Sequence, residues 1–415
     1  MVLTYLVLLL FSGSAFLGFV LNAIFSKIHI ANIIPLMFIG ILIGFILNKN
    51  MPGEDAILQA LTPYVTTLAA AFILFDAGMN INFSKLKSII FRSTIFVMTV
   101  ALLFALGSAV IAYFSFGWNF TECLAFGFAI SGPSALIIPA ITKMLNVKDS
   151  IKSILVYESV ITDVMELVIP FVLFEALATG ALSAKAIVYM IAYSFIASTL
   201  FGVATSMFWL YLLKAFSAVS KDYSWILTLT MVIATYSSAQ LLGMNGLIAI
   251  FVFGIVFSLL GSTEIRYGLH DLSFSSRYFA VPDFVGHIKD YQKEIVFFAS
   301  AFFFVYIGIL FKISSLNAFI IIISLCISLM PVFIRMLLSG TLKKYFSIDL
   351  YSQKIERNLV NFNVPRGLSP AIIATLPLLL GIYIPNFLDS IFLIILFTNI
   401  IYSIGFVLFY KRKKF

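Results

Sequence analysis

A short stretch in the middle third of the sequence, Tyr-Glu-Ser-Val-Ile-Thr-Asp-Val-Met-Glu, places acidic and hydroxyl side chains inside a long apolar run. Glu158 and Thr162 are four residues apart, so on a helix they share one face. Ser159 and Asp163 have the same spacing and lie on the adjoining strip. Carboxylate and hydroxyl oxygens suit hard cations such as sodium. The pattern therefore predicts a sodium site at Asp163, Glu158 and Ser159, with Thr162 beside them.

Further acids lie in apolar surroundings. Ionisable side chains at membrane depth are rare and usually mark an ion or proton pathway. Glu166, three residues after Asp163, is a candidate additional acid, and the alternative is an acid that serves only packing or a helix end. Asp76, in another apolar stretch, is a second candidate, which lines an entrance or only caps a helix.

Two arginines, Arg335 and Arg366, lie within or beside apolar stretches and are able to balance these acids. An arginine next to an acid keeps that acid ionised. We therefore predict that both arginines form supporting charge pairs. The acid without a permanent partner is then expected to carry the exchanging ion.

The composition requires that the elements carrying these residues face lipid. The chain of 415 residues is 62% apolar and 11% charged, whereas soluble domains are about 45–50% apolar and about 25% charged. Too few charges remain to cover a water-exposed surface. The net charge of +8 does not indicate nucleic acid, because the basic residues lie in short segments between apolar stretches and form no continuous patch.

Thirteen stretches are long and apolar enough to cross a bilayer, for which a helix needs about 20 residues. They predict an all-α membrane protein with thirteen transmembrane helices and one sizeable polar loop at 261–293. The predicted helices cover residues 2–24, 31–47, 59–79, 90–114, 123–142, 151–178, 186–213, 224–241, 245–261, 294–311, 315–338, 358–380 and 387–410.

The distribution of basic residues predicts the orientation. An odd number of helices places the two ends on opposite sides, and the basic tail after residue 410 favours a cytoplasmic C-terminus. Of the 26 lysines and arginines, only Lys49, Lys185 and Lys312 then fall in outside segments. We therefore predict a multi-pass protein of the cell membrane with its N-terminus outside.

The chain also contains signs of an internal repeat. Similar glycine-punctuated apolar runs occur at 34–44 and 245–254. They predict that residues 1–178 and 224–410 are two six-helix repeats, joined by a linker helix at 186–213. Because one helix separates them, the repeats enter the membrane from opposite sides, and the whole chain (1–415) is one integral membrane transporter unit.

Each repeat contains one helix that glycine and proline interrupt, by Ser-Gly-Pro-Ser at 131–134 and by Val-Pro-Arg-Gly-Leu-Ser-Pro at 364–370. Proline removes a donor and clashes with the preceding turn, and the freed backbone groups need partners inside a membrane. Secondary transporters bind ions where two such broken helices cross near the midplane. The alternative is a pair of kinks without function.

Several motifs resemble those of the cation:proton antiporters, in the NhaP-like sodium/proton branch. Glu-Ser-x-x-Thr-Asp at 158–163 is similar to that family's Glu-Ser-x-x-Asn-Asp motif. Ala-Ile-Ser-Gly-Pro-Ser at 129–134 resembles its Thr-Asp-Pro break, and Phe-Asp-Ala-Gly-Met-Asn-Ile at 75–81 resembles its Phe-Glu-Gly-Gly-Leu-Asn-Leu. Further similar segments lie at 242–254, 302–308 and 365–369.

The resemblance implies a fold of thirteen helices in which a six-helix core domain moves against a dimerisation domain. A homodimer is therefore expected. The resemblance also implies that Arg335 pairs with Glu158 and that Arg366 stabilises the crossing of the two broken helices.

For the site, the resemblance implies that Asp163 binds either sodium or a proton. Glu158 and Ser159 would add ligands or hold the site, and the backbone around Ser131 would contribute carbonyl groups. The expected partners are monovalent cations, protons and membrane lipid, and no cofactor is expected.

The chain departs from the family pattern at three positions. Thr162 stands where the family has Asn, Gly132 stands where the first break has Asp, and Glu166 is an extra acid. These differences leave the choice among sodium, lithium and potassium open, and also the stoichiometry.

The expected function is secondary active exchange of sodium or lithium for protons, with alternating access at a buried carboxylate. With Asp163 as the one exchanging acid, the exchange is predicted to be electroneutral, whereas a Glu166 that also cycles protons makes it electrogenic. The alternatives are a potassium/proton antiporter, a sodium-coupled solute symporter of similar fold, and a channel, for which no filter motif is visible. No enzyme is expected, because neither a nucleophile–base pair nor a metal motif is visible.

Overall fold

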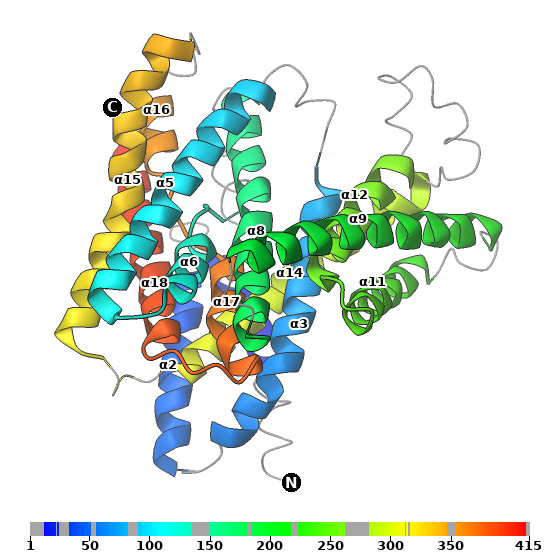
Figure 1. The fold of residues 1–415 in the computed structure, drawn as a ribbon, viewed down its shortest axis with the longest axis horizontal. Coiled ribbons are helices and arrows are strands. Elements are labelled where there is room, and N and C mark those ends of the chain that lie inside the picture. The colour runs from blue at the N-terminus through cyan, green and yellow to red at the C-terminus, as the bar shows by residue number, and fades with distance from the viewer. Residues whose placement is uncertain are drawn as a thin grey trace. The chain divides into compact units, whose positions relative to one another are not determined.

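The computed structural model describes most of the chain, and within the described residues it consists of helices and their connections, with no strand (Figure 1). The predicted all-α fold is confirmed. The described residues are 12–21, 23–24, 33–50, 55–81, 90–134, 149–180, 184–216, 223–261, 282–311, 313, 316–346 and 354–411.

The chain divides into two compact units. The first comprises Met1–Pro63, Leu86–Ala178 and Ser300–Phe415, and the second comprises Tyr64–Lys85 and Thr179–Ala299. This division groups residues by contact within each unit, so it does not test the two predicted sequence repeats. The boundaries of those repeats stay a prediction.

The first unit holds most of the helices. Within it, α8 packs against both α6 and α17, and α15 packs against α5 and α18. The helix α8 therefore contacts both short helices that flank the predicted breaks. The helices of this unit are α2 (Ile33–Asn50), α5 (Ile90–Phe116), α6 (Phe120–Ala129), α8 (Asp149–Ala178), α15 (Ala318–Phe346), α16 (Lys354–Asn361), α17 (Leu368–Leu379) and α18 (Phe387–Lys411).

The second unit is built on α9 (Ala184–Ala215), α11 (Ser224–Leu241) and α12 (Gly246–Gly261), with α12 packed against the other two. Two further helices, α3 (Asp55–Met79) and α14 (Pro282–Leu310), have residues in both units.

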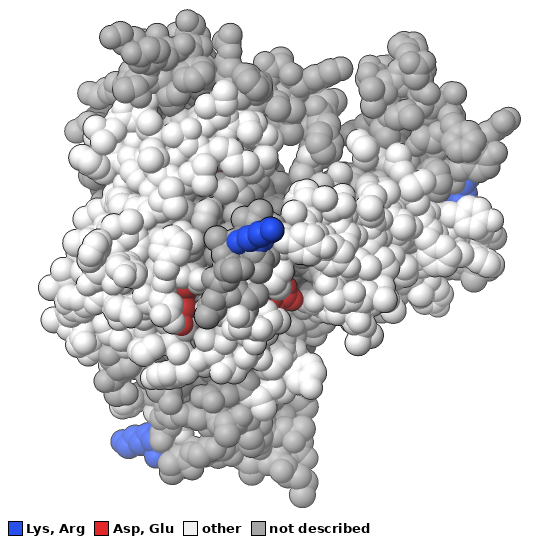
Figure 2. All heavy atoms as spheres, in the orientation of Figure 1, with Lys and Arg blue, Asp and Glu red and all other residues white. Residues whose placement is uncertain are grey.

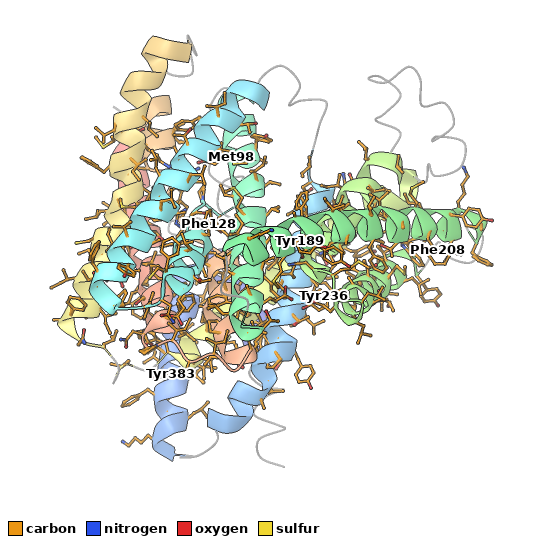
Figure 3. The ribbon with its side chains drawn as sticks, viewed as in Figure 1. Met98, Phe128, Tyr189, Phe208, Tyr236 and Tyr383 are labelled. Atoms are coloured by element: carbon orange, nitrogen blue, oxygen red, sulfur yellow. The ribbon has the colours of Figure 1, made fainter. Side chains whose placement is uncertain are left out.

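Large apolar side chains project from the outer surfaces of these helices. Tyr189 and Phe208 on α9 are each more than half exposed, and Figure 3 shows them extending away from the helix. On the face shown in Figure 2, the described surface is almost entirely neither acidic nor basic. A surface that is apolar and poor in charge suits contact with lipid, as the composition predicts.

Six helices in the described residues are long and apolar enough to cross a membrane by length and composition. Each overlaps one of the predicted spans, while the total of thirteen stays a prediction. The six are Ala60–Met79, Thr94–Phe116, Ala192–Ala215, Val285–Leu310, Ala318–Leu338 and Phe387–Gly405.

The predicted loop at 261–293 is wrong over its last twelve residues, because α14 already begins at Pro282. Val285, Ile288 and Gln292 are buried at intervals of three and four residues, which is the spacing of one helical face. The opposite face carries the polar residues that made this segment resemble a loop. Residues 262–281 of the predicted loop lie outside the described residues.

Both predicted helix breaks are present, and proline explains where each begins. The ring of a proline clashes with the carbonyl group four residues earlier. For Pro133 that residue is Ala129, the last residue of α6, and for Pro365 it is Asn361, the last residue of α16. The chain is non-helical at 130–134 and 362–367, and α17 then begins at Leu368. The continuation of the first broken helix after residue 134 lies outside the described residues.

Candidate functional site

The two non-helical segments meet directly inside the first unit. The backbone N–H of Ser134 donates a hydrogen bond of 2.8 Å to the carbonyl oxygen of Pro365. A Cβ atom at Gly367 would collide with the Ser134 side chain, so the approach requires glycine at that position. The two breaks therefore hold one another through their backbones, and they satisfy polar groups that the broken helices leave free.

The helix α18 supports the second break through two hydrogen bonds. The Thr398 hydroxyl accepts a hydrogen bond of 3.2 Å from the backbone N–H of Arg366. The Asn399 amide donates one of 2.8 Å to the Arg366 carbonyl oxygen. Both side chains are buried. The backbone of Arg366 is thereby fixed without use of its guanidinium group.

The acids of the predicted site project from α8 into the region of these breaks. Glu158 is buried, and its carboxylate forms an ion pair with the buried Arg335 of α15, as the resemblance implies. The Asn363 amide, from the second break, donates a further hydrogen bond of 3.2 Å to Glu158. Arg335 also donates a bond of 3.1 Å to the Val360 carbonyl oxygen. Both oxygens of Glu158 are thus engaged by groups of this unit.

Asp163 also projects from α8, and its carboxylate lies at the beginning of α17. Its side chain is 6% exposed, and its Oδ1 accepts a hydrogen bond of 2.8 Å from the Ser369 hydroxyl. Ser369 is the second residue of α17, so the carboxylate stands at a helix N-terminus. The positive end of the helix dipole favours a negative charge there.

Glu166 is a residue of α8 as well, and its carboxylate lies at the other break, just after the end of α6. Its side chain is 1% exposed, and its Oε1 accepts a hydrogen bond from the backbone N–H of Gly132. Asp163 and Arg366 are the charged groups that act on it most strongly. Glu166 is therefore part of the same buried cluster as Asp163.

Thr162 occupies the space beside Gly132. A Cβ atom at Gly132 would collide with the Thr162 side chain. The Thr162 hydroxyl itself donates to the Glu158 carbonyl oxygen at 2.9 Å within α8. These two departures from the family pattern therefore go together, since the threonine fills the place that a side chain at position 132 would need.

The remaining predicted ligands are buried near these groups. Ser159 donates a bond of 2.9 Å to the Val156 carbonyl oxygen in its own helix. The Ser131 hydroxyl has no hydrogen-bond partner among the described residues. Ser131 directly precedes Gly132 at the end of α6, where the helix leaves carbonyl groups free. Carboxylate, hydroxyl and carbonyl oxygens are therefore the groups available here to hold a cation.

Arg366 faces this cluster without a full set of partners. Its guanidinium group lies over the Phe104 ring, 4.7 Å from the ring centroid. Its Nε and Nη1 atoms have no hydrogen-bond partner within the described part of the chain. A cation over an aromatic face gains electrostatic stabilisation, but it remains able to act on acids nearby.

Asp76 lies on α3 in the second unit, and it is half-buried. Lys289 and Lys293 of α14 act on its charge, and its Oδ1 has no hydrogen-bond partner among the described residues. Its contacts therefore belong to the second unit, and a role in exchange stays a prediction.

Three contributors were not expected from the sequence. Ser369 binds Asp163, Asn363 binds Glu158, and Phe104 covers Arg366. A signal existed for the first two, because polar side chains in a broken membrane helix need a buried partner. Phe104 is one of 45 phenylalanines, so nothing in the sequence distinguished it.

The comparisons with known proteins agree with the fold. The family model described as "Sodium/hydrogen exchanger, transmembrane" matches residues 12–412. A structure of the sodium proton antiporter MjNhaP1 from Methanocaldococcus jannaschii at pH 8 is similar, with a TM-score of 0.71 and 19% sequence identity. That similarity covers 98% of this chain and 99% of the other.

An electron-microscopy structure of the same antiporter gives a TM-score of 0.66 at 18% identity, covering 96% of this chain and 93% of that one. No curated protein sequence matched the chain. At such identities the structural similarity shows the fold, while the family model covers nearly the whole sequence. The chain therefore belongs to the transmembrane sodium/hydrogen exchanger family.

Proposed function

We propose that this protein exchanges sodium ions for protons across the cell membrane, and that Asp163 is the carboxylate that binds either ion. The family supports cation/proton antiport in general. The observation that carries the assignment is the contrast between two buried acids of α8. Glu158 is engaged by Arg335 and Asn363, whereas the Asp163 carboxylate lies at the α17 N-terminus beside a hydroxyl group. Glu158 therefore stabilises the structure, and Asp163 binds the transported ion.

Exchange follows from competition for one charge. A buried carboxylate is expensive while it is ionised and uncompensated. A proton removes the charge, and a bound sodium ion compensates it, so the two ions exclude one another. The empty site keeps a buried negative charge and therefore resists the change of access from one side of the membrane to the other.

The remaining ligands of sodium are proposed from the same geometry. Hydroxyl oxygens of Ser159, Thr162 and Ser369, with carbonyl oxygens around Ser131, are the candidate ligands that would join the Asp163 carboxylate. All are hard oxygen donors, which suits sodium or lithium better than softer ions. The similar antiporter MjNhaP1 is described as exchanging sodium and protons, which favours sodium over potassium here.

The proposal also covers the stoichiometry, the orientation in the membrane and the oligomeric state. One exchanging carboxylate gives one sodium ion per proton and no net charge movement. The orientation with an outside N-terminus rests on the basic residues, of which three fall in predicted outside segments, Lys49, Lys185 and Lys312. A homodimer is proposed from the family resemblance.

The test is sodium-dependent proton efflux from proteoliposomes that contain a pH-sensitive dye. Wild type is expected to respond to sodium, Asp163→Asn to lose the response, and Asp290→Asn to keep it. Asp290 is the matched control, because its side chain is 79% exposed and lies in the second unit. A wild type that does not respond to sodium, lithium or potassium refutes the proposal.

The same vesicles test electroneutrality. A membrane potential imposed by potassium and valinomycin is expected to leave the rate of sodium-coupled pH change unaltered. A rate that rises or falls with the potential shows net charge movement and excludes one-for-one exchange.

A further inference from the structure

The two short helices beside the breaks, α6 and α17, lie next to each other in the first unit (Figure 1). At the breaks they are joined by the hydrogen bond from the Ser134 N–H to the Pro365 carbonyl oxygen. A second junction lies at their opposite ends. There the indole N–H of Trp118, two residues before α6, donates a hydrogen bond of 3.0 Å to the carbonyl oxygen of Pro385. Pro385 belongs to the connection from α17 to α18, so the two short helices are tied at both ends.

Trp118 is fixed to the beginning of α6. The next residue, Asn119, is the N-cap of the helix, and its backbone N–H donates a bond of 2.9 Å to the Glu122 carboxylate. The Cys123 thiol donates to the Trp118 carbonyl oxygen at 3.6 Å. The Trp118 ring packs against Phe126 of α6, with 5.2 Å between the ring centroids. The indole therefore has a defined place relative to the helix axis.

The acceptor is fixed to the end of α17 in a similar way. The backbone N–H of Ile382 donates a bond of 2.8 Å to the Pro377 carbonyl oxygen in the last turn of the helix. Asn386, directly after Pro385, has a φ of 62°. That conformation is uncommon for a residue with a side chain and persists where the surroundings hold it. The connection after α17 therefore has a defined shape.

Aromatic rings enclose this second junction. Trp118 is 4% exposed and stacks on Phe116, with 4.5 Å between the ring centroids. Its ring also lies 5.6 Å from that of Phe387, which in turn packs against Phe174 of α8 at 5.5 Å. In such apolar surroundings an indole N–H needs its acceptor, because a buried donor without one is costly. The bond to Pro385 is therefore a specific tie between the two segments.

The tie acts at a distance from the ion site, through two stiff helices. With ten and twelve residues, α6 and α17 are about 15 Å and 18 Å long, and helices of this length curve very little. At the break, the segment after α6 supplies the Gly132 N–H that binds Glu166. The first turn of α17 supplies the Ser369 hydroxyl that binds Asp163. Two rods joined at one end pivot about that junction, and a second junction removes this freedom.

We infer that Trp118 is a positioning residue, which ties the far ends of α6 and α17 and thereby fixes the two break ends around Asp163. Its effect on sodium rests on the proposed function, because it concerns the geometry of that same site. The tie itself does not depend on which ion is bound.

The test removes the indole N–H and keeps an aromatic ring, in Trp118→Phe. The matched control is Trp209→Phe, which removes another indole N–H, one that donates a bond of 2.9 Å to Thr228 in the second unit. Amide hydrogen exchange over residues 130–134 reports how often the break opens. Sodium-dependent proton efflux over a range of sodium concentrations gives KM and maximal rate separately.

Trp118→Phe is expected to accelerate amide hydrogen exchange at 130–134 at least threefold. It is also expected to raise KM for sodium at least threefold, with the maximal rate within twofold of wild type. Trp209→Phe is expected to leave all three quantities within twofold. Amide exchange in α15 is followed in parallel and is expected to stay unchanged in Trp118→Phe. Equal acceleration in α15 and at 130–134 refutes the inference, because Trp118 then only stabilises the unit as a whole.

A second variant serves if Trp118→Phe does not fold. Phe116→Leu retains the indole N–H but removes the ring that stacks on it, at a half-buried position. It is expected to accelerate amide hydrogen exchange at 130–134 at least twofold, again without a change in α15. A smaller acceleration refutes the inference.

The outcomes separate this inference from the proposed function. If wild type exchanges sodium for protons and Trp118→Phe changes neither amide exchange at 130–134 nor KM by threefold, the inference is refuted and antiport at Asp163 stands. A threefold change in only one of the two also refutes it, because the tie then does not act on the site. If wild type does not transport, the proposed function fails, and amide exchange at 130–134 alone decides whether Trp118 positions the break ends.

Discussion

Replacing Arg335 by methionine is expected to destabilise the protein strongly, because Glu158 then remains buried without its partner. The Nη1 atom of Arg335 lies 3.3 Å from Oε2 of Glu158, and both side chains are at most 2% exposed. At this distance, with an effective dielectric constant of about 20, two unit charges attract by about 5 kcal/mol. Breaking buried pairs by removal of one partner typically costs about 3–5 kcal/mol, which agrees with this attraction.

The double variant Glu158→Gln/Arg335→Met identifies the cause of the loss. It removes both charges, so it is expected to be more stable than Arg335→Met alone, even though it carries one more substitution. The Asn363 amide retains an oxygen acceptor in Glu158→Gln, so that hydrogen bond can persist. The thermal midpoint of the purified protein in detergent is measured for wild type and for the single and double variants.

An exposed pair provides the matched control. Lys293 and Asp290 are 2.9 Å apart, with side chains 63% and 79% exposed. Exposed pairs contribute about 1 kcal/mol or less, so Lys293→Met is expected to leave the midpoint nearly unchanged. The reasoning is refuted if Arg335→Met is as stable as wild type, or if the double variant is less stable than Arg335→Met.

Two further predictions concern the crossing and the site. Gly132→Ala is expected to destabilise the protein by about 1–3 kcal/mol, because its Cβ collides with Thr162. Gly286→Ala, on α14 with open space around it, is expected to leave the thermal midpoint unchanged or raise it, and equal effects of both alanines contradict the steric argument. Ser369→Ala removes the hydrogen bond to Asp163 Oδ1 and is expected to change KM for sodium several-fold with little loss of folded protein, as measured by proton efflux and gel filtration. An unaltered KM shows that the hydroxyl does not act on the site.

Much of the helical fold was predictable from apolar run length. The predicted helix at 224–241 has the same bounds as α11, because polar and turn residues limit the apolar run at both ends. The beginning of α14 was not predictable in this way. From Val285 to Lys293 the helix has only one buried face, and the rest of this part carries His287, Lys289, Asp290 and Lys293. Periodicity, and not average hydropathy, is the property that indicates such a segment.

The residues of the site were predictable only as parts of separate elements. Spacing along one helix shows that Glu158, Thr162, Asp163 and Glu166 belong together, since their Cα positions follow from helix geometry alone. The positions of the prolines also show where the helices break, because proline acts on the carbonyl group four residues earlier whatever the surroundings.

By itself, the sequence therefore determined the lipid-facing class, the acids of α8, the two breaks and the resemblance to the exchanger family. The tertiary structure decided which acid has which partner. Ser369 reaches Asp163 across 206 residues and Arg335 reaches Glu158 across 177. Such contacts depend on how the helices pack and on which positions are glycine and so allow close approach. The residues next to each position in the sequence do not specify the packing. The proposed roles of Glu158 in stability and of Asp163 in exchange rest on that packing.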